Sequence, residues 1–118
     1  MEGCLLEAKV AALLGLARRA NKVAVGDLAV RAALERGRAA LVVIATDAGS
    51  STRDRIDRLC SRAGQQPVAA GTKADLGAAI GQTEKAVLAV TDQHFAKGIR
   101  AALGNGVEAS EPNISGVD

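Results

Sequence analysis

Two aspartates carry the side chains best suited to catalysis in this sequence. Asp47 and Asp92 each follow an apolar run and share the local sequence Thr-Asp. At the ends of neighbouring strands, two carboxylates could hold a magnesium ion for phosphoryl transfer, because hard cations prefer oxygen ligands. Each aspartate also stands shortly before an expected helix, where this residue type commonly caps the first turn. Capping is the favoured interpretation, and the metal site stays open as an alternative.

Nucleophilic catalysis finds less support. His94 is the single histidine, and the sequence places no serine or cysteine beside it, so a surface or capping role is expected. The sequence contains no P-loop, GxSxG or GxGxxG pattern. Cys4 and Cys60 lack metal-ligand spacing, and Cys60 falls on the apolar stripe of an expected helix, which predicts a buried thiol.

Phosphate binding has a better candidate in a helix amino terminus. Gly26 and Asp27 open an expected helix whose free backbone amides, with nearby cations, could hold the phosphates of a structured RNA. Helix capping alone would also explain the two residues. The other groups expected near this edge are Lys22, Arg31, Thr72-Lys73 and the loop Gly81–Lys85.

Charge is distributed unevenly along the chain. The net charge is only +2, but residues 18–62 contain ten basic and five acidic residues, whereas residues 65–118 contain four basic and six acidic ones. Arginine outnumbers lysine ten to five, and guanidinium groups favour bidentate phosphate contacts. Phe95 is the only aromatic residue, so the stacking platform of a single-strand binder is excluded. An ordinary solvated helix surface remains the alternative explanation of the basic half.

Apolar periodicity predicts the elements that hold these residues. We expect helices over about residues 4–20, 28–36, 51–63, 73–80 and 93–103, and short strands at 22–25, 40–45, 67–70 and 86–90. The alternation predicts an α/β/α sandwich with a small mixed, largely parallel sheet. The expected helix caps are Asp27, Ser51, Thr72 and Asp92, and the expected glycine stops are Gly37 and Gly81.

The chain is expected to form one domain over residues 1–103, followed by a disordered tail over 104–118 that is rich in glycine, polar and acidic residues. No apolar segment approaches the roughly 20 residues that span a bilayer. The amino terminus has an acid where a signal peptide would carry positive charge, which predicts a cytoplasmic protein.

Several short motifs, taken in order, resemble a known family. They are Leu13-Leu14-Gly15-Leu16-Ala17-Arg18-Arg19-Ala20, Lys22 with Gly26, Ala45-Thr46-Asp47-Ala48 with Ser51-Thr52, Leu76-Gly77-Ala78-Ala79-Ile80-Gly81, and Asp92 with Phe95-Ala96-Lys97. Their order and spacing resemble the bacterial YlxQ-like branch of the ribosomal L7Ae/L30e superfamily, whose better-known members bind kink-turn RNA. The similarity covers about residues 5–100.

The resemblance implies the same sandwich, no enzymatic activity, no catalytic or metal-binding residue and no cofactor. It implies binding of structured RNA, either rRNA or an mRNA leader, in translation or ribosome assembly. We expect a monomer rather than an oligomer. The ribosome and translation factors are further expected partners, and no membrane is involved. RNA would contact the amino end of the second helix and two neighbouring loops, at Lys22, Gly26, Asp27, Leu28, Arg31, Lys73, Gln82, Thr83, Glu84 and Lys85.

The resemblance is incomplete on the helix that would read the RNA. In kink-turn binders that helix opens with glycine, any residue, asparagine, glutamate, two further residues and lysine. Gly26 matches here, but Leu28, Ala29 and Ala32 stand at the three polar positions. Leucine and alanine cannot hydrogen-bond base edges, and a good bidentate contact is worth about 1–3 kcal/mol in duplex DNA. Phosphate contacts would persist and make binding more salt-dependent.

Two further departures affect the same surface. Arg31 lies one residue before the lysine position, about 100° around the helix, where it would reach a phosphate. The loop Gly81–Lys85 is polar, whereas the family's loop is apolar and cups an extruded nucleotide. A protein-interaction module that uses an exposed Leu28 is therefore kept as an alternative function.

Overall fold

The computed structural model describes residues 7–107, with side chains described over residues 7–103. Its two central strands, β2 (Leu41–Ile44) and β4 (Val87–Val90), are buried at every position, as their unbroken apolar runs predict. The remaining elements are α1 (Ala8–Arg19), β1 (Val23–Val25), α2 (Asp27–Glu35), α3 (Ser50–Arg62), β3 (Val68–Ala69), α4 (Lys73–Ala79) and α5 (Gln93–Val107).

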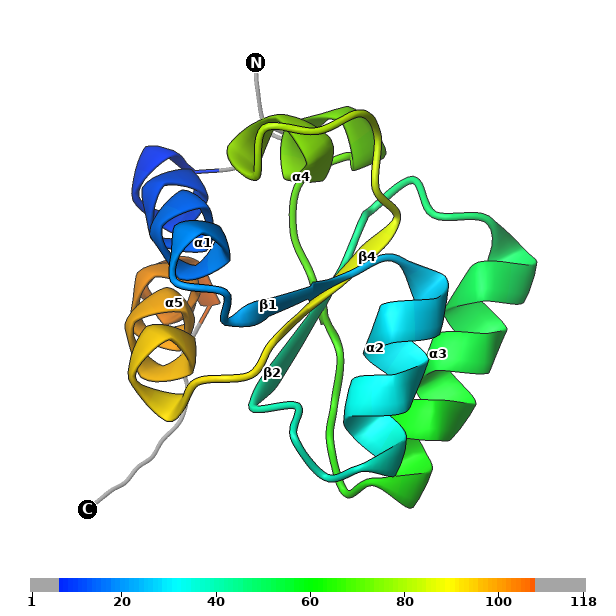
Figure 1. Cartoon of the computed structure of the whole chain (residues 1–118). Coiled ribbons are helices and arrows are strands. Elements are labelled where there is room, and N and C mark those ends of the chain that lie inside the picture. Colours follow the sequence, from blue (N-terminus) through cyan, green and yellow to red (C-terminus); the bar gives the residue numbers. More distant parts are fainter. Residues whose placement is uncertain (1–6, 108–118) are drawn as a thin grey trace.

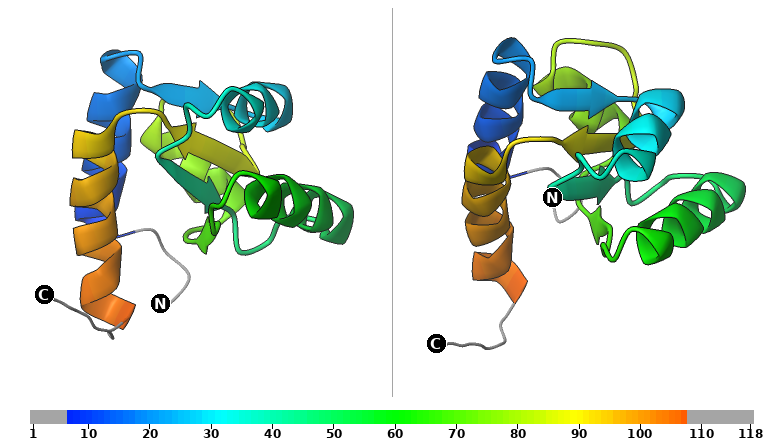
Figure 2. Two further views of the ribbon diagram at one scale, coloured as in Figure 1. Left: turned by 90° about the horizontal axis from the view of Figure 1, so that it is seen from below. Right: turned by 60° about the horizontal axis from the view of Figure 1, so that its bottom comes forward.

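Helices cover both faces of the sheet, so the predicted α/β/α sandwich is confirmed (Figure 1). Helices α1, α4 and α5 pack on the face that carries Leu41, Val43 and Leu88. Helices α2 and α3 pack on the opposite face, where alternate residues such as Val42 and Ala89 point. Figure 2 shows the sheet between the α1–α5 pair and the α2–α3 pair.

The sheet is mixed, with strand order β1-β4-β2-β3, but it is not largely parallel as predicted. β4 runs antiparallel to both of its neighbours, and only β2 and β3 pair in parallel. The physical reason is α4, whose seven residues do not carry the chain back along the sheet. The chain returns to the start of α4, where the Lys85 amide donates to the Lys73 carbonyl at 3.1 Å, and β4 begins there.

The predicted helix ends are partly correct. Thr72 and Asp75 form the expected capping box of α4, and the Asp92 carboxylate accepts from the His94 amide at 2.7 Å. Gly37 and Gly81 have positive φ angles, as expected of helix stops.

Two predicted caps are wrong. Gly26 caps α2 and Gly49 caps α3, in both cases without a side-chain hydrogen bond. Asp27 lies inside the first turn and Ser51 is the second residue of its helix. The Asp27 carboxylate instead forms a long-range ion pair, which is described below.

The predicted boundary between domain and tail stays a prediction. α5 is described as far as Val107, and residues 108–118 lie outside the described part, as do residues 1–6 with Cys4.

Candidate functional site

Three helices begin at one edge of the sheet, which we call the helix-start edge. Strands β1, β2 and β3 run in one direction and end there, and β4 starts there because it runs the opposite way. Each of the three strands is followed by a helix, so the amino termini of α2, α3 and α4 all lie at this edge (Figure 1). The first-turn amides of α2 and α3 have no side-chain cap, and with the partial positive charges of these helices they make the edge favourable for anions. The start of α4 is capped by Asp75 and Asp47.

Gly26 forms the turn between β1 and α2 at this edge. Its φ of 88° and ψ of 171° lie in a region that is open essentially to glycine alone. The Gly26 amide donates to the Val87 carbonyl at 3.2 Å, which ties the turn between β1 and α2 to the first residue of β4. A glycine is therefore required here for the chain to pass from the edge strand into α2.

The arginines of this edge are paired within the protein. The Arg55 guanidinium on α3 contacts the Asp27 carboxylate at 2.5 Å, and both side chains are about two-fifths exposed. Arg31 contacts Glu35 at 3.3 Å along α2. Arg53 of α3 donates to the Thr46 carbonyl at 3.0 Å. Arg53 and Arg55 were not among the predicted site residues, although the excess of arginine between residues 18 and 62 could have indicated them.

Asp47 positions the start of α4. Its carboxylate accepts from the Lys73 amide at 2.8 Å, and the neighbouring Thr46 amide and hydroxyl both donate to the Gly71 carbonyl. These bonds join the loop after β2 to the loop after β3. The motif that contains Thr46 and Asp47 therefore holds two helix starts together.

The alternative of a magnesium site shared by Asp47 and Asp92 does not agree with the sheet. Because β4 is antiparallel to β2, Val90 pairs with Leu41 and the end of β4 lies at the edge opposite Asp47. Among the residues that the structure describes, no three acidic, cysteine or histidine side chains are grouped as metal ligands. Asp92 caps the helix that follows it, as the sequence favoured. Asp47 accepts from the first amide of α4 and does not cap α3, the helix that follows it.

The loop Gly81–Lys85 is pressed against α4. A Cβ atom on Gly77 would lie 2.1 Å from the Thr83 carbonyl oxygen, a distance that no real contact allows. The Gln82 amide also donates to the Gly77 carbonyl at 2.8 Å. Gly77 thus permits the close approach that fixes the loop, while the Gln82 and Thr83 side chains stay exposed.

The structure brings most of the predicted surface together but separates Lys22 from it. Gly26, Asp27, Leu28, Arg31, Lys73, Gln82, Thr83 and Lys85 lie on elements that meet at the helix-start edge. Lys22 precedes β1, and its carbonyl accepts from the Thr91 amide at the opposite edge. The three residues of β1 separate it from Gly26, a distance of about 13 Å along extended chain.

Leu28 is the largest apolar side chain at the helix-start edge that remains in solvent, with 82% of it exposed. It lines a shallow hollow of the α2–α3 surface together with Asp27, Arg31 and Arg55. Ala29 is exposed as well, whereas Ala32 is half-buried. The three positions at which the family has polar side chains therefore present only apolar atoms.

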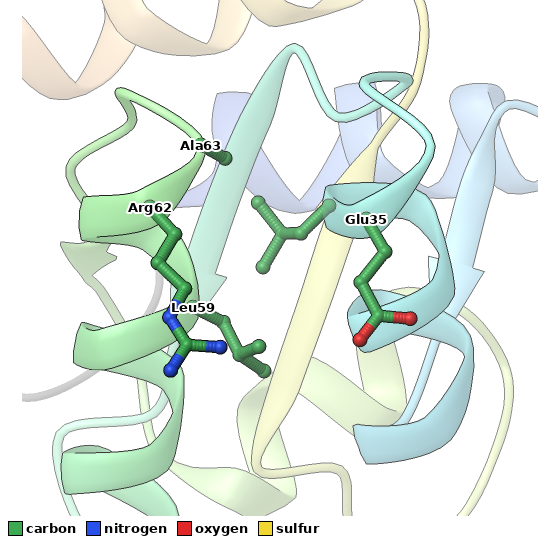
Figure 3. A pocket seen from close by; sticks show the side chains of 5 residues that line it. Glu35, Leu59, Arg62 and Ala63 are labelled. Carbon is green, nitrogen blue, oxygen red and sulfur yellow. The ribbon is translucent and has the colours of Figure 1, made fainter.

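A second hollow lies along the same pair of helices, at their carboxyl ends (Figure 3). Leu34, Leu59 and Ala63 supply its apolar lining, and the figure shows Arg62 of α3 and Glu35 of α2 on facing sides. Cys60 of α3 points into the core and is buried, as predicted. Burial, with a smaller contribution from Asp57, raises the pKa of the Cys60 thiol from 9.0 to about 11, so the thiol is protonated near neutral pH.

Two other sequence expectations have structural outcomes. His94 is exposed in the first turn of α5, in agreement with the predicted surface or capping role. None of the helices in the described part of the chain has the length and apolarity to cross a membrane.

A family model described as "Ribosomal protein L7Ae/L30e/S12e/Gadd45 family" matches residues 8–99. The RNA-binding protein YlxQ of Bacillus subtilis (strain 168) is 37% identical over 91 residues, which are 77% of this chain and 91% of the relative. These matches agree with the resemblance noted in the sequence.

Solved structures are similar as well. A Bacillus halodurans protein of unknown function has a TM-score of 0.76 at 35% identity, over 80% of this chain and 96% of that one. The 15.5kD RNA binding protein of Giardia lamblia has a TM-score of 0.70 at 21% identity, over 82% of this chain and 83% of the other. The second similarity concerns the fold alone.

Proposed function

The chain belongs to the ribosomal protein L7Ae/L30e/S12e/Gadd45 family, and we propose that it binds structured RNA at the helix-start edge, in translation or ribosome assembly in the cytoplasm. The family and the Bacillus subtilis relative are ribosomal and RNA-binding proteins rather than enzymes, which agrees with the prediction from sequence. The proposed RNA partner is an rRNA segment or an mRNA leader, bound by a monomer.

The observation that carries this proposal is the meeting of three helix amino termini at one edge. Backbone amides at helix starts recognise phosphate oxygens irrespective of sequence, and the first-turn amides of α2 and α3 are free of side-chain caps at this edge. Lys73 and Lys85 add two cations at the same edge, on segments joined by a backbone hydrogen bond of 3.1 Å. The edge is therefore suited to a folded RNA backbone.

Recognition of RNA bases is expected to be weak. Leu28 and Ala29 present methyl groups at positions where kink-turn binders have polar side chains, and Arg31 is engaged by Glu35. Methyl groups form no hydrogen bonds with sheared G·A pairs. We therefore propose that the RNA shape determines affinity, with lower kink-turn selectivity than in members that keep the asparagine, glutamate and lysine.

Fluorescence anisotropy with a kink-turn RNA and a straight duplex, each titrated over a salt series, tests the proposal. We expect binding to both RNAs, a modest preference for the kink-turn and a steep salt dependence. Lys73→Gln with Lys85→Gln should weaken binding to both RNAs about tenfold. Lys9→Gln with Lys97→Gln, which removes the same charge on α1 and α5, should not. Absence of binding at low salt would refute the function.

An exposed Leu28 also favours a second candidate, a protein-interaction surface at the same hollow. A leucine with four-fifths of its area in solvent is a suitable apolar anchor for a partner. Leu28→Asn separates the two functions, because it restores a polar reader and removes the anchor. Tighter kink-turn binding by this variant supports the RNA function, and unchanged RNA binding with loss of a protein complex supports the alternative.

A further inference from the structure

A cluster of free arginines lies at the end of α2 and α3 that is opposite to the helix-start edge. Arg36 and Arg38 follow α2, and Arg62 is the last residue of α3. All three are exposed, and within residues 7–107 none has a hydrogen-bond or ion-pair partner. We call the segments 36–40 and 61–67 the arginine end; they contain these three arginines and no acidic residue.

The backbone that carries these arginines is held in place. The Gln65 side chain donates to the Ala39 carbonyl at 2.5 Å, which joins the loop after α2 to the loop after α3. The Arg100 guanidinium of α5 donates to the neighbouring Ala40 carbonyl at 2.8 Å. The loop that contains Arg38 is thus fixed from both sides of the sheet, although its own charged group is left free.

Glu35 is the acid nearest to this cluster in the hollow that Figure 3 shows. It already accepts from Arg31 at 3.3 Å, on the side of the helix-start edge. The positive charge of the arginine end therefore has no acidic partner of its own in the described structure.

Resting on the proposed RNA-binding function, we propose that the arginine end is a second contact surface for RNA phosphates. It engages a duplex arm that extends beyond the segment held at the helix-start edge. α3 has 13 residues and spans about 20 Å, so one RNA reaches both surfaces only if an arm runs along the α2–α3 face. The helices thus carry an amide-rich site at one end and a guanidinium-rich site at the other.

The chemistry of the cluster favours phosphate over an acidic protein. All three cations are arginines, whose planar groups bind phosphate oxygens in a bidentate manner. The described residues with large exposed apolar side chains are Leu16 and Leu28, which lie outside the arginine end. A protein interface would need an apolar anchor among the charges, and this end provides none in solvent.

The test compares two RNAs that share one structured core, one with a duplex arm of about 16 base pairs and one with the arm removed. The unaltered protein should bind the long-arm RNA about tenfold more tightly than the short one. Arg38→Gln with Arg62→Gln should abolish this difference, lower the slope of log K against log salt by about 2, and leave short-arm binding unchanged. Lys9→Gln with Lys97→Gln is the matched control and should keep the difference.

Each outcome bears on the proposal. Equal binding of the two RNAs by the unaltered protein, or an equal effect of both double variants, would overturn the second surface while leaving the helix-start edge as the RNA site. If the arginine variant bound both RNAs more weakly by the same factor, the proposal would also be overturned, because the arm would then make no difference to affinity. No binding of either RNA would overturn both proposals. Circular dichroism confirms that each variant is folded, and Arg38→Lys with Arg62→Lys should recover part of the affinity.

Discussion

The arginines at the two ends of the α2–α3 pair differ in their ion pairing. At the helix-start edge, Arg31 and Arg55 are paired with Glu35 and Asp27. At the arginine end, Arg36, Arg38 and Arg62 are free of partners in the described structure. Pairing orients a guanidinium but reduces its attraction for phosphate, whereas a free one attracts phosphate over a longer distance. Under the proposed function, one end would position RNA by shape and the other would add affinity by charge.

The largest effect is expected at Gly77, whose missing side chain makes room for the loop of the helix-start edge. Gly77→Ala should lower the free energy of unfolding by about 3 kcal/mol, because the clashing atoms belong to the backbone of Thr83. Urea unfolding measures this change, and hydrogen exchange should show loosened amides over residues 82–85. Gly98→Ala is the control, since its Cβ would meet only Leu13 at an ordinary 3.5 Å. Equal effects of the two variants would contradict the packing argument.

The second effect concerns Cys60, a buried residue of α3 in the core on which both α2 and α3 pack. Burial raises the pKa of the Cys60 thiol from 9.0 to about 11, so the unfolded chain loses this proton at lower pH than the folded protein. Stability is therefore retained below pH 9 and should fall, by up to about 2 kcal/mol, as the pH rises toward 11. Urea unfolding at several pH values measures the slope. Cys60→Ala should remove this loss of stability between pH 9 and 11. If the variant loses stability over this range as steeply as the unaltered protein, other groups are responsible.

A smaller effect should separate the turns at the two ends. Gly26→Ala should cost about 1–3 kcal/mol, because the backbone conformation at Gly26 is essentially restricted to glycine. Gly37, which stops α2 at the arginine end, has a φ of 69°, a left-handed conformation that asparagine tolerates. Gly37→Asn should therefore cost only a few tenths of a kcal/mol. Thermal unfolding compares the two, and a larger loss for the Gly37 variant would reverse this ranking of the turns.

The smallest effect tests whether pairing limits the helix-start edge. Asp27→Asn releases Arg55 and removes a negative charge, so we expect RNA affinity to rise about threefold while stability falls by less than about 1 kcal/mol. Anisotropy at low salt measures the affinity. Asp54→Asn removes the same charge from an exposed position on α3 and should change affinity less. If both variants bind equally, net charge alone explains the gain.

The sequence predicted the elements well because their signals are local. The buried strands β2 and β4 follow from unbroken apolar runs, and the capping box of α4 follows from the three-residue spacing of Thr72 and Asp75. The meeting of the α2 start with the loop over residues 81–85 was expected from the resemblance. Its geometry follows from the strand directions in the sheet.

Strand direction was not predictable from the sequence, and the placement of two groups of residues depended on it. A run of four apolar residues is compatible with either direction, so the antiparallel β4 separated Asp92 from Asp47. Lys22 was placed on the RNA surface by its closeness in sequence to Gly26, although a strand carries it to the other edge. The pairing of Arg55 with Asp27 joins residues 28 positions apart, and no local pattern indicates such a contact.

The placement of the strands also bears on solubility. The segments Leu41–Ile44 and Val87–Val90 have the composition of aggregation-prone strands, but each is paired on both sides within the sheet. The outer positions belong to β1 and β3, which are three and two residues long and offer little template for pairing with another molecule. Precipitation of this protein should therefore require unfolding, so the solubility of its variants should follow their stability.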